Sequence, residues 1–142
     1  MAQGTVPIVV SVTVDTSVYI GTLNSQGFGA HLFTMARAGT IRIDISDAIL
    51  DETIRVLREK FAWDGYRLHD ARLRLLSFTN HVTPTQVLDV IKEDPPDNRI
   101  LECAVEAHSN YIVTWDKDLL RLRQYAGIEI VKANDFLQRW QH

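Results

Sequence analysis

Apolar residues along this chain follow two spacings, one typical of strands and one typical of helices. Short runs rich in β-branched residues have the length and composition of buried strands, and the first of them, IVVSVTV, ends at Asp15. Another run, TIRIDI, alternates apolar and polar side chains. We predict strands at residues 8–14, 40–45, 111–114 and 128–131, and short extended pieces at 82–83 and 87–91.

Between these runs, apolar residues recur every three or four positions, which is the spacing of an amphipathic helix. Ser46 and Asp64 each precede such a stripe, and both residue types commonly cap helix N-termini. We expect Asn134 to cap a final helix that ends at residue 140. The other predicted helices cover residues 28–38, 47–62 and 66–78, with one more beginning at residue 97 and a short helical turn at 116–122.

Strands that alternate with helices predict an α/β fold, with a mainly parallel sheet flanked by helices on both faces. The chain has 142 residues without a repeat or linker, so we expect a single domain over residues 1–142. No apolar stretch is long enough to cross a membrane, and the N-terminus lacks the pattern of a signal peptide. Cys103 has no second cysteine to pair with, so we expect a cytoplasmic protein with no membrane contact.

The chain carries 15 Lys and Arg against 18 Asp and Glu, a formal net charge of −3. This balance argues against non-specific coating of nucleic acid, but a nucleic-acid enzyme remains open because its active site can itself be acidic. The histidines show no zinc-ligand spacing, and no Gly-rich phosphate loop or nucleophile elbow is present. The candidate chemistry therefore lies in the carboxylates.

Acidic residues occupy informative positions in the predicted fold. Asp15 and Asp116 each follow a predicted strand, Asp97 begins a helix, and Glu52 lies in the first half of another helix. Ligands of parallel sheets bind beyond the carboxyl ends of the strands, so these acids can converge in one crevice. Converging carboxylates suit Mg²⁺ or Mn²⁺, and two such ions can activate water for phosphodiester cleavage.

Each of these acids also has a purely structural interpretation. Asp15 is a residue type that forms turns after strands, and Asp97 and Asp116 are natural helix caps. Glu52 projects beside the apolar stripe of its helix, which favours a surface position and an ion pair with Arg55. From the residues alone, both sets of interpretations stay open.

Three segments, taken in order, resemble the PIN-domain family, in particular its branch of toxins from toxin–antitoxin systems. The segments are VTVDTSVYI, SDAILDETIRVLREKF and DPPDNRILECAVEAHSNYIVTWDKDLLRL. The resemblance implies a Rossmann-like fold and a metal-dependent endonuclease that cuts single-stranded RNA with Mg²⁺ or Mn²⁺. It also implies a small antitoxin protein as a partner, and a homodimer.

The resemblance assigns roles to individual side chains. The catalytic and metal-binding acids that it implies are Asp15, Glu52, Asp97 and Asp116. The polar groups that it implies as supports, holding ligands or water, are Ser17, Asn98, Thr114 and Asp118.

Trp115 departs from the family pattern, in which a small residue is more usual at this position. Its ring would narrow the cleft or favour stacking, although from the sequence we expect the tryptophans to pack at helix ends.

Two other function classes remain open. One is a receiver-like phosphoacceptor, which lacks here the adjacent acids expected after the first strand. The other is a non-catalytic interaction module that keeps only the fold.

Overall fold

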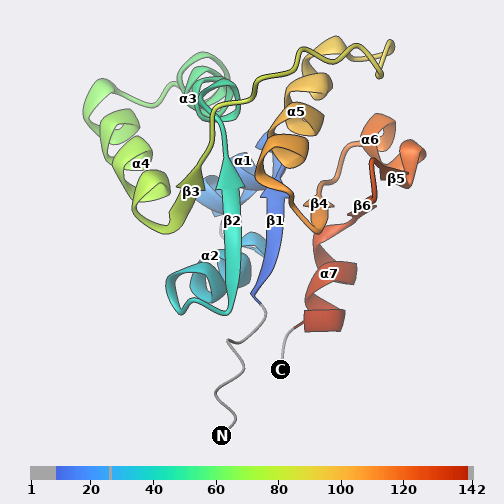
Figure 1. Ribbon diagram of the computed structural model, residues 1–142. Helices are drawn as coiled ribbons and strands as arrows, with labels where there is room; N and C mark the ends of the chain where they lie inside the picture. The colour runs from blue at the N-terminus through green and yellow to red at the C-terminus, as the bar shows by residue number, and fades with distance from the viewer. Residues whose placement is uncertain (1–8, 26, 141–142) are drawn as a thin grey trace, which may run out of the picture.

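The computed structural model describes residues 9–25 and 27–140. Within these ranges, six strands form one sheet (Figure 1). The strands are β1 (Val10–Val14), β2 (Ile41–Ile45), β3 (Thr79–His81), β4 (Tyr111–Val113), β5 (Gln124–Tyr125) and β6 (Ile128–Val131). Their order is β3-β2-β1-β4-β6-β5, and every neighbouring pair is parallel except β5 with β6. The mainly parallel sheet predicted from the sequence is therefore confirmed.

Helices cover both faces of this sheet. They are α1 (Thr16–Ser25), α2 (Gly29–Arg37), α3 (Asp47–Phe61), α4 (Gly65–Phe78), α5 (Asn98–Ala107), α6 (Lys117–Leu122) and α7 (Ala133–Trp140), with a 3₁₀ turn, η1, at Pro95–Asp97. In Figure 1, α5 lies in front of β1 and β2, whereas α1 and α2 lie behind them. Successive strand side chains point to opposite faces, and all five residues of β1 are buried, as expected for a strand covered on both sides.

Helix α1 was not among the helices predicted from the sequence. Its sequence, TSVYIGTLNS, is poor in strong helix formers, because Thr, Ser, Asn and Gly predominate. Tertiary burial compensates, since Val18 and Tyr19 are inserted into the core. The hydroxyl groups of Thr22 and Ser25 donate hydrogen bonds to backbone carbonyls four residues earlier, at 2.7 and 2.9 Å, and so stay inside the helix. The helix thus depends on packing rather than on local sequence preference.

The extended pieces predicted at residues 82–83 and 87–91 form no strand. Strand β3 lies just before them, where it follows α4 directly and pairs with β2. Beyond Val82, side chains of α5 bond the backbone N–H groups of Thr85, Leu88 and Ile91. These donors are therefore not available to a strand partner.

The last helix begins two residues earlier than predicted, at Ala133 instead of residue 135. Asn134 lies inside α7 rather than at its cap, and its buried Oδ1 has no hydrogen-bond partner among the described residues.

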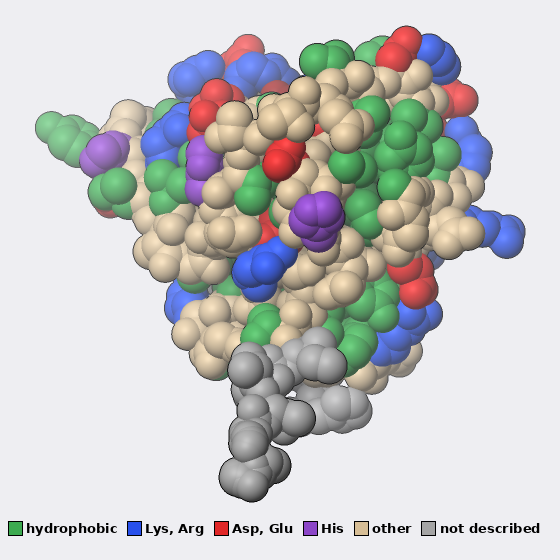
Figure 2. Space-filling model, in the orientation of Figure 1, with side chains coloured by type: hydrophobic (Ala, Val, Ile, Leu, Met, Phe, Trp, Pro, Cys, Tyr) green, Lys and Arg blue, Asp and Glu red, His purple; other side chains and the backbone are tan. Residues whose placement is uncertain are grey.

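In the part of the chain that the structure describes, no helix is both long and apolar enough to cross a membrane. On the face seen in Figure 2, acidic and basic side chains lie interspersed.

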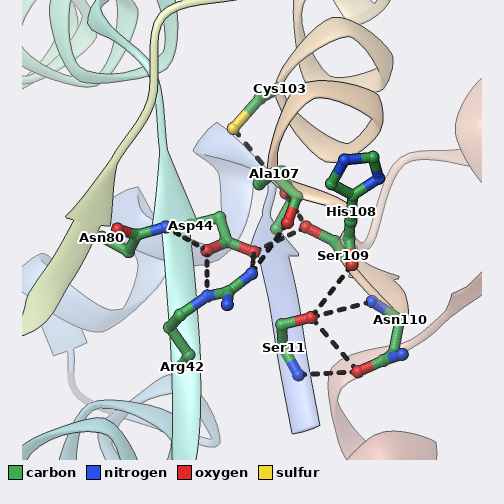
Figure 3. A network of polar contacts seen from close by, with 10 residues as sticks. Ser11, Arg42, Asp44, Asn80, Cys103, Ala107, His108, Ser109 and Asn110 are labelled. Atoms are coloured by element: carbon green, nitrogen blue, oxygen red, sulfur yellow. Dashed lines mark hydrogen bonds and ion pairs between the residues drawn. The ribbon is translucent and has the colours of Figure 1, made fainter.

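A buried polar network ties α5 to the sheet (Figure 3). Its centre is Asp44 on β2, whose carboxylate is fully buried and accepts hydrogen bonds from Arg42, Asn80 and Ser109 at 2.7, 3.0 and 2.7 Å. Ser109, two residues after the end of α5, also shares a 2.8 Å hydrogen bond with Thr13 on β1. The network therefore joins three strands to the loop between α5 and β4.

Candidate active site

A cavity of about 710 Å³ lies where the first and fourth strands end. Val14 of β1 and Val113 of β4 are direct partners in parallel strands, so the residues that follow them reach the same edge of the sheet. Five carboxylates line the cavity, and they are Asp15, Glu52, Asp94, Asp97 and Asp116. All four acids that were singled out in the sequence thus meet in one place, together with a fifth that was not.

Four carboxylates in this region form a close cluster. One oxygen from each of Asp94, Asp97, Asp116 and Asp118 lies within 4.8 Å of the other three. Sequence reasoning missed Asp94, although the motif DPPD carries a usable signal. A 3₁₀ helix has three residues per turn, so residues three apart lie one above the other, and Pro95 and Pro96 favour this backbone.

Asp97 is the most constrained member of the cluster. Its side chain is only 8% exposed, and its Oδ2 atom has no hydrogen-bond partner among the described residues. Burial, as the largest cause, and the negative charges of Asp116, Asp15 and Asp94 together raise the pKa of Asp97 to about 8. Its carboxylate makes no capping hydrogen bond to α5, so the capping interpretation of Asp97 is wrong. A buried, unpaired carboxylate oxygen among other acids is well suited to bind a cation.

Asp15 is held from two sides. Its Oδ2 accepts hydrogen bonds from the hydroxyl of Thr114 at 2.7 Å and from that of Ser17 at 2.9 Å. Burial raises the pKa of Asp15, the two hydroxyl groups oppose this rise, and the charge of Asp116 adds to it. Thr114 also accepts a 2.9 Å hydrogen bond from the backbone N–H of Asp116. One buried hydroxyl therefore connects the acids that follow β1 and β4.

Asp116 combines two roles that the sequence left as alternatives. Its Oδ1 accepts hydrogen bonds from the backbone N–H groups of Asp118 and Leu119, so it caps α6 as expected. The same side chain lines the cavity and belongs to the four-carboxylate cluster. Asp118 adds an oxygen to the cluster and also forms an ion pair with Arg121 at 3.2 Å.

Glu52 likewise combines a surface ion pair with a place in the cavity wall. Its carboxylate accepts a 2.6 Å hydrogen bond from Arg55 and is 34% exposed, so the predicted surface ion pair is confirmed. Glu52 nevertheless lines the cavity, although it lies outside the cluster of four. Its role in metal binding stays a prediction.

Asn98 acts on the backbone beside the cluster. Its Oδ1 accepts hydrogen bonds from the N–H groups of Val90 and Ile91, and its Nδ2 donates to the carbonyls of Ile91 and Pro95, all at 2.8–2.9 Å. The amide is thereby fully engaged, and it anchors the segment that leads to Asp94.

Basic groups at the rim also escaped the sequence reasoning. Arg55 and Lys60 of α3 line the cavity together with Glu52 and Val56. The signal was present in their spacing, because residues 52, 56 and 60 lie four apart and so share one side of the helix. The arrangement places basic side chains beside a cluster of acids. It suits an anionic substrate if metal ions neutralise the acids.

Comparisons with known proteins bear on the family and the fold of the chain. A family model described as PIN domain matches residues 11–118. The crystal structure of PAE2754 from Pyrobaculum aerophilum is similar to the chain, with a TM-score of 0.65 and 18% sequence identity. That match covers 93% of this chain and 90% of the other, and at this identity it shows the fold alone. No curated protein matches the chain.

Proposed function

Because the chain belongs to the PIN-domain family and its carboxylates meet in one cavity, we propose that it is a Mg²⁺- or Mn²⁺-dependent endoribonuclease that cuts single-stranded RNA. Membership of the family, predicted from three sequence segments, is confirmed, and it supports a nuclease-type hydrolase. The single observation that carries the proposal further is the buried, unpaired Oδ2 of Asp97 within a cluster of four carboxylates.

The residues fit a hard divalent cation. All the clustered donors are carboxylate oxygens, which Mg²⁺ and Mn²⁺ prefer, and no histidine or cysteine belongs to the cluster. Asp94, Asp97, Asp116 and Asp118 are the proposed ligands, with Asp15 and Glu52 at the same cavity. When bound, such ions lower the pKa of water and stabilise a leaving oxygen in phosphodiester cleavage.

The chain's own groups would orient the reactants. The hydroxyls of Thr114 and Ser17 keep Asp15 facing one way by binding the same oxygen. Lys60 at the rim supplies positive charge for backbone phosphates, which an acidic cavity alone would repel, whereas the charge of Arg55 is offset by Glu52 and Glu59. A cavity lined by carboxylates that could hold divalent cations, with a basic side chain at its rim, suits a substrate with a phosphodiester backbone.

The proposal extends to a role as the toxin of a toxin–antitoxin pair. What supports it is the resemblance carried by the three sequence segments. On this proposal, the partners are RNA, a small antitoxin protein and a second copy of the chain, and the protein acts in the cytoplasm. Co-purification of a small protein that abolishes cleavage would support this role.

Cleavage of a labelled single-stranded RNA, with Mg²⁺ or Mn²⁺ against EDTA, tests the nuclease proposal. Asp15→Asn and Asp116→Asn keep shape and remove charge, so we expect each variant to fold and to lose cleavage, because like-charge repulsion is relieved while cation binding is lost. Asp70→Asn, on the exposed part of α4, is the matched control and should cut normally. A folded double variant that still cuts in a Mg²⁺-dependent way would overturn the assignment.

Glu52→Gln belongs to the same experiment, because Glu52 both pairs with Arg55 and lines the cavity. If Glu52 contributes to cation binding, the variant folds and loses cleavage. If it only pairs with Arg55 at the surface, the variant is silent in both assays, since exposed ion pairs contribute little.

A further inference from the structure

A second, smaller recess adjoins the acidic cavity. It has a volume of about 200 Å³, and its walls are one side of α1 together with the rings of Phe28 and Trp115. Gly21 lines both this recess and the acidic cavity, so the two hollows are neighbours on the surface of α1. Trp115 stands in the chain between Thr114 and Asp116, both of which belong to the acidic site. We propose that this recess binds a nucleobase of the single-stranded substrate, next to the phosphate that is cut.

The two rings are available for stacking. Trp115 is 42% exposed and Phe28 is 53% exposed, so the expectation that Trp115 packs away at a helix end is wrong. Their centroids lie 6.3 Å apart and their planes are tilted by 51°, so the two rings do not form a parallel stack with each other. A planar ligand can therefore lie against either ring, as bases do in proteins that bind single strands.

Gly21 supplies a second and independent observation. Glycine in the middle of a helix is destabilising relative to alanine, so its presence in α1 needs a reason. Packing does not provide one, because a Cβ atom placed on Gly21 would meet nothing within 4 Å. Gly29 shows the contrast, since a Cβ there would lie 1.6 Å from the Thr22 hydroxyl. The missing side chain of Gly21 keeps open the surface that joins the recess to the acidic cavity.

The chemistry of the walls selects a base rather than a phosphate. No charged side chain lines the recess among the residues that the structure describes. The hydroxyl groups of Thr22 and Ser25 already donate to carbonyls of α1. An uncharged planar group therefore suits the recess, and the charged phosphate suits the neighbouring cation site. Bases can enter such a recess only when they are not paired, which favours a single strand.

The test measures binding apart from cleavage, because the inference rests on the proposed function. Binding of a fluorescein-labelled single-stranded RNA is followed by anisotropy in Ca²⁺, which binds similar oxygen ligands with looser geometry. We expect Trp115→Ala to weaken binding about 5- to 100-fold, the contribution of one stacked base, and Phe28→Ala to weaken it less. Gly21→Leu should also weaken binding while raising the melting temperature. Tyr66→Ala, at an aromatic residue of α4 that is 89% exposed, is the control and should bind normally.

RNA with one abasic position, moved along the strand, identifies the base. We expect one abasic position to weaken binding to the wild-type protein but to cause no further loss in Trp115→Ala. One outcome is that the wild-type protein cuts RNA while a folded Trp115→Ala or Gly21→Leu variant binds RNA as tightly as the wild type does. In that case the recess inference is overturned and the nuclease proposal stands. If the wild-type protein neither binds nor cuts RNA, the nuclease proposal itself fails, and the inference fails with it.

Discussion

Among single side chains, the buried Thr114 hydroxyl has the widest effect on the site. It donates to Asp15 and accepts from the backbone N–H of Asp116, and these two partners follow different strands. Each bond is of ordinary length, but without the hydroxyl the N–H of Asp116 would lose its partner and Asp15 would keep only the hydrogen bond from Ser17. A neutral residue that binds no cation itself can thus determine where two acids stand.

Thr114→Val keeps the shape of the side chain and removes its hydrogen bonds. We expect the free energy of unfolding to fall by about 1–3 kcal/mol, because buried polar groups lose their partner. Activity should fall roughly 10- to 100-fold, the usual effect of losing a group that orients a metal ligand. Thr114→Ser keeps the hydroxyl, so the free energy of unfolding in urea and the rate of RNA cleavage should both stay close to the wild-type values. Equal loss in the Ser and Val variants would contradict this role of the hydroxyl.

The pKa of Asp97, raised to about 8 against an ordinary value near 3.8, predicts how stability depends on pH. Between these two values the folded state binds more protons than the unfolded state. The free energy of unfolding of the metal-free protein therefore falls as the pH rises from about 4 to about 8. Asp97→Asn should flatten this dependence in EDTA, whereas Asp70→Asn should not.

Added Mn²⁺ should reverse the pH trend. The cation binds the ionised carboxylates and must compete with protons below about pH 8, so its stabilising effect grows as the pH rises. Thermal unfolding at several pH values, with EDTA or with Mn²⁺, measures both effects. An unchanged slope in Asp97→Asn would show that another group causes the dependence.

Among the elements, α5 has a function beyond covering the sheet. Asn98, Glu102 and Glu106 lie four residues apart, on one side of the helix. They accept hydrogen bonds from backbone N–H groups of the segment between β3 and η1, including those of Thr85 and Leu88. An irregular segment is thus ordered by side chains of a helix instead of by a neighbouring strand. Because this segment ends at Asp94, α5 determines where that carboxylate stands.

Asn98→Ala should loosen this segment. We expect a loss of about 1–3 kcal/mol in the free energy of unfolding and weaker Mn²⁺ binding, since backbone groups near Asp94 lose their partners. Hydrogen exchange at the amides of Val90 and Ile91 should become faster. Asn24→Ala is a suitable control, because the Asn24 side chain is exposed and, among the described residues, bonds only the carbonyl of Ile20. Unchanged exchange at both amides would argue against the anchoring role.

For the molecule as a whole, stability depends on the buried polar network around Asp44 as well as on the apolar core. The main core lies on both faces of the sheet, and a smaller cluster joins α3 to α4 around Trp63. The Asp44 network crosses the sheet near the main core and brings together β1, β2, β3 and the loop after α5 (Figure 3). A charge at this depth is tolerated because three side chains donate to it.

Asp44→Ala removes the acceptor that these groups share. We expect destabilisation near the lower end of roughly 3–5 kcal/mol, because Arg42 is partly exposed and can turn to solvent while Ser109 cannot. Lys92→Ala, which removes an exposed ion pair with Asp89, should change stability by less than about 0.5 kcal/mol. Urea unfolding of both variants makes the comparison. A small effect of Asp44→Ala would show that water replaces the network.

Much of the fold could be predicted because its signals are local. Runs of β-branched residues identified β1, β2, β4 and β6, and periodic apolar stripes identified α3 and α4. The convergence of Asp15 and Asp116 was also predictable, since parallel strands bring their carboxyl ends to one edge. In both cases, a few neighbouring residues determine the outcome.

Other features depended on contacts between distant segments. Helix α1 has weak local preference and forms because Val18 and Tyr19 are buried. Asp94 joins the cluster because of the η1 turn and the hold of Asn98 on the preceding segment. The exposure of Trp115 depends on how α1 and Phe28 approach it.

The sequence by itself therefore determined the strands β1, β2, β4 and β6, most helices and the acids at the sheet edge. Only the tertiary structure decided which side chains complete the site and how each one is held. The Thr114 hydroxyl and the Asp15 carboxylate show the reason, because they are 99 residues apart in the chain and 2.7 Å apart in space. Periodicity reports the face on which a residue lies, but a hydrogen bond between remote residues forms only when the crossovers between parallel strands bring both partners together.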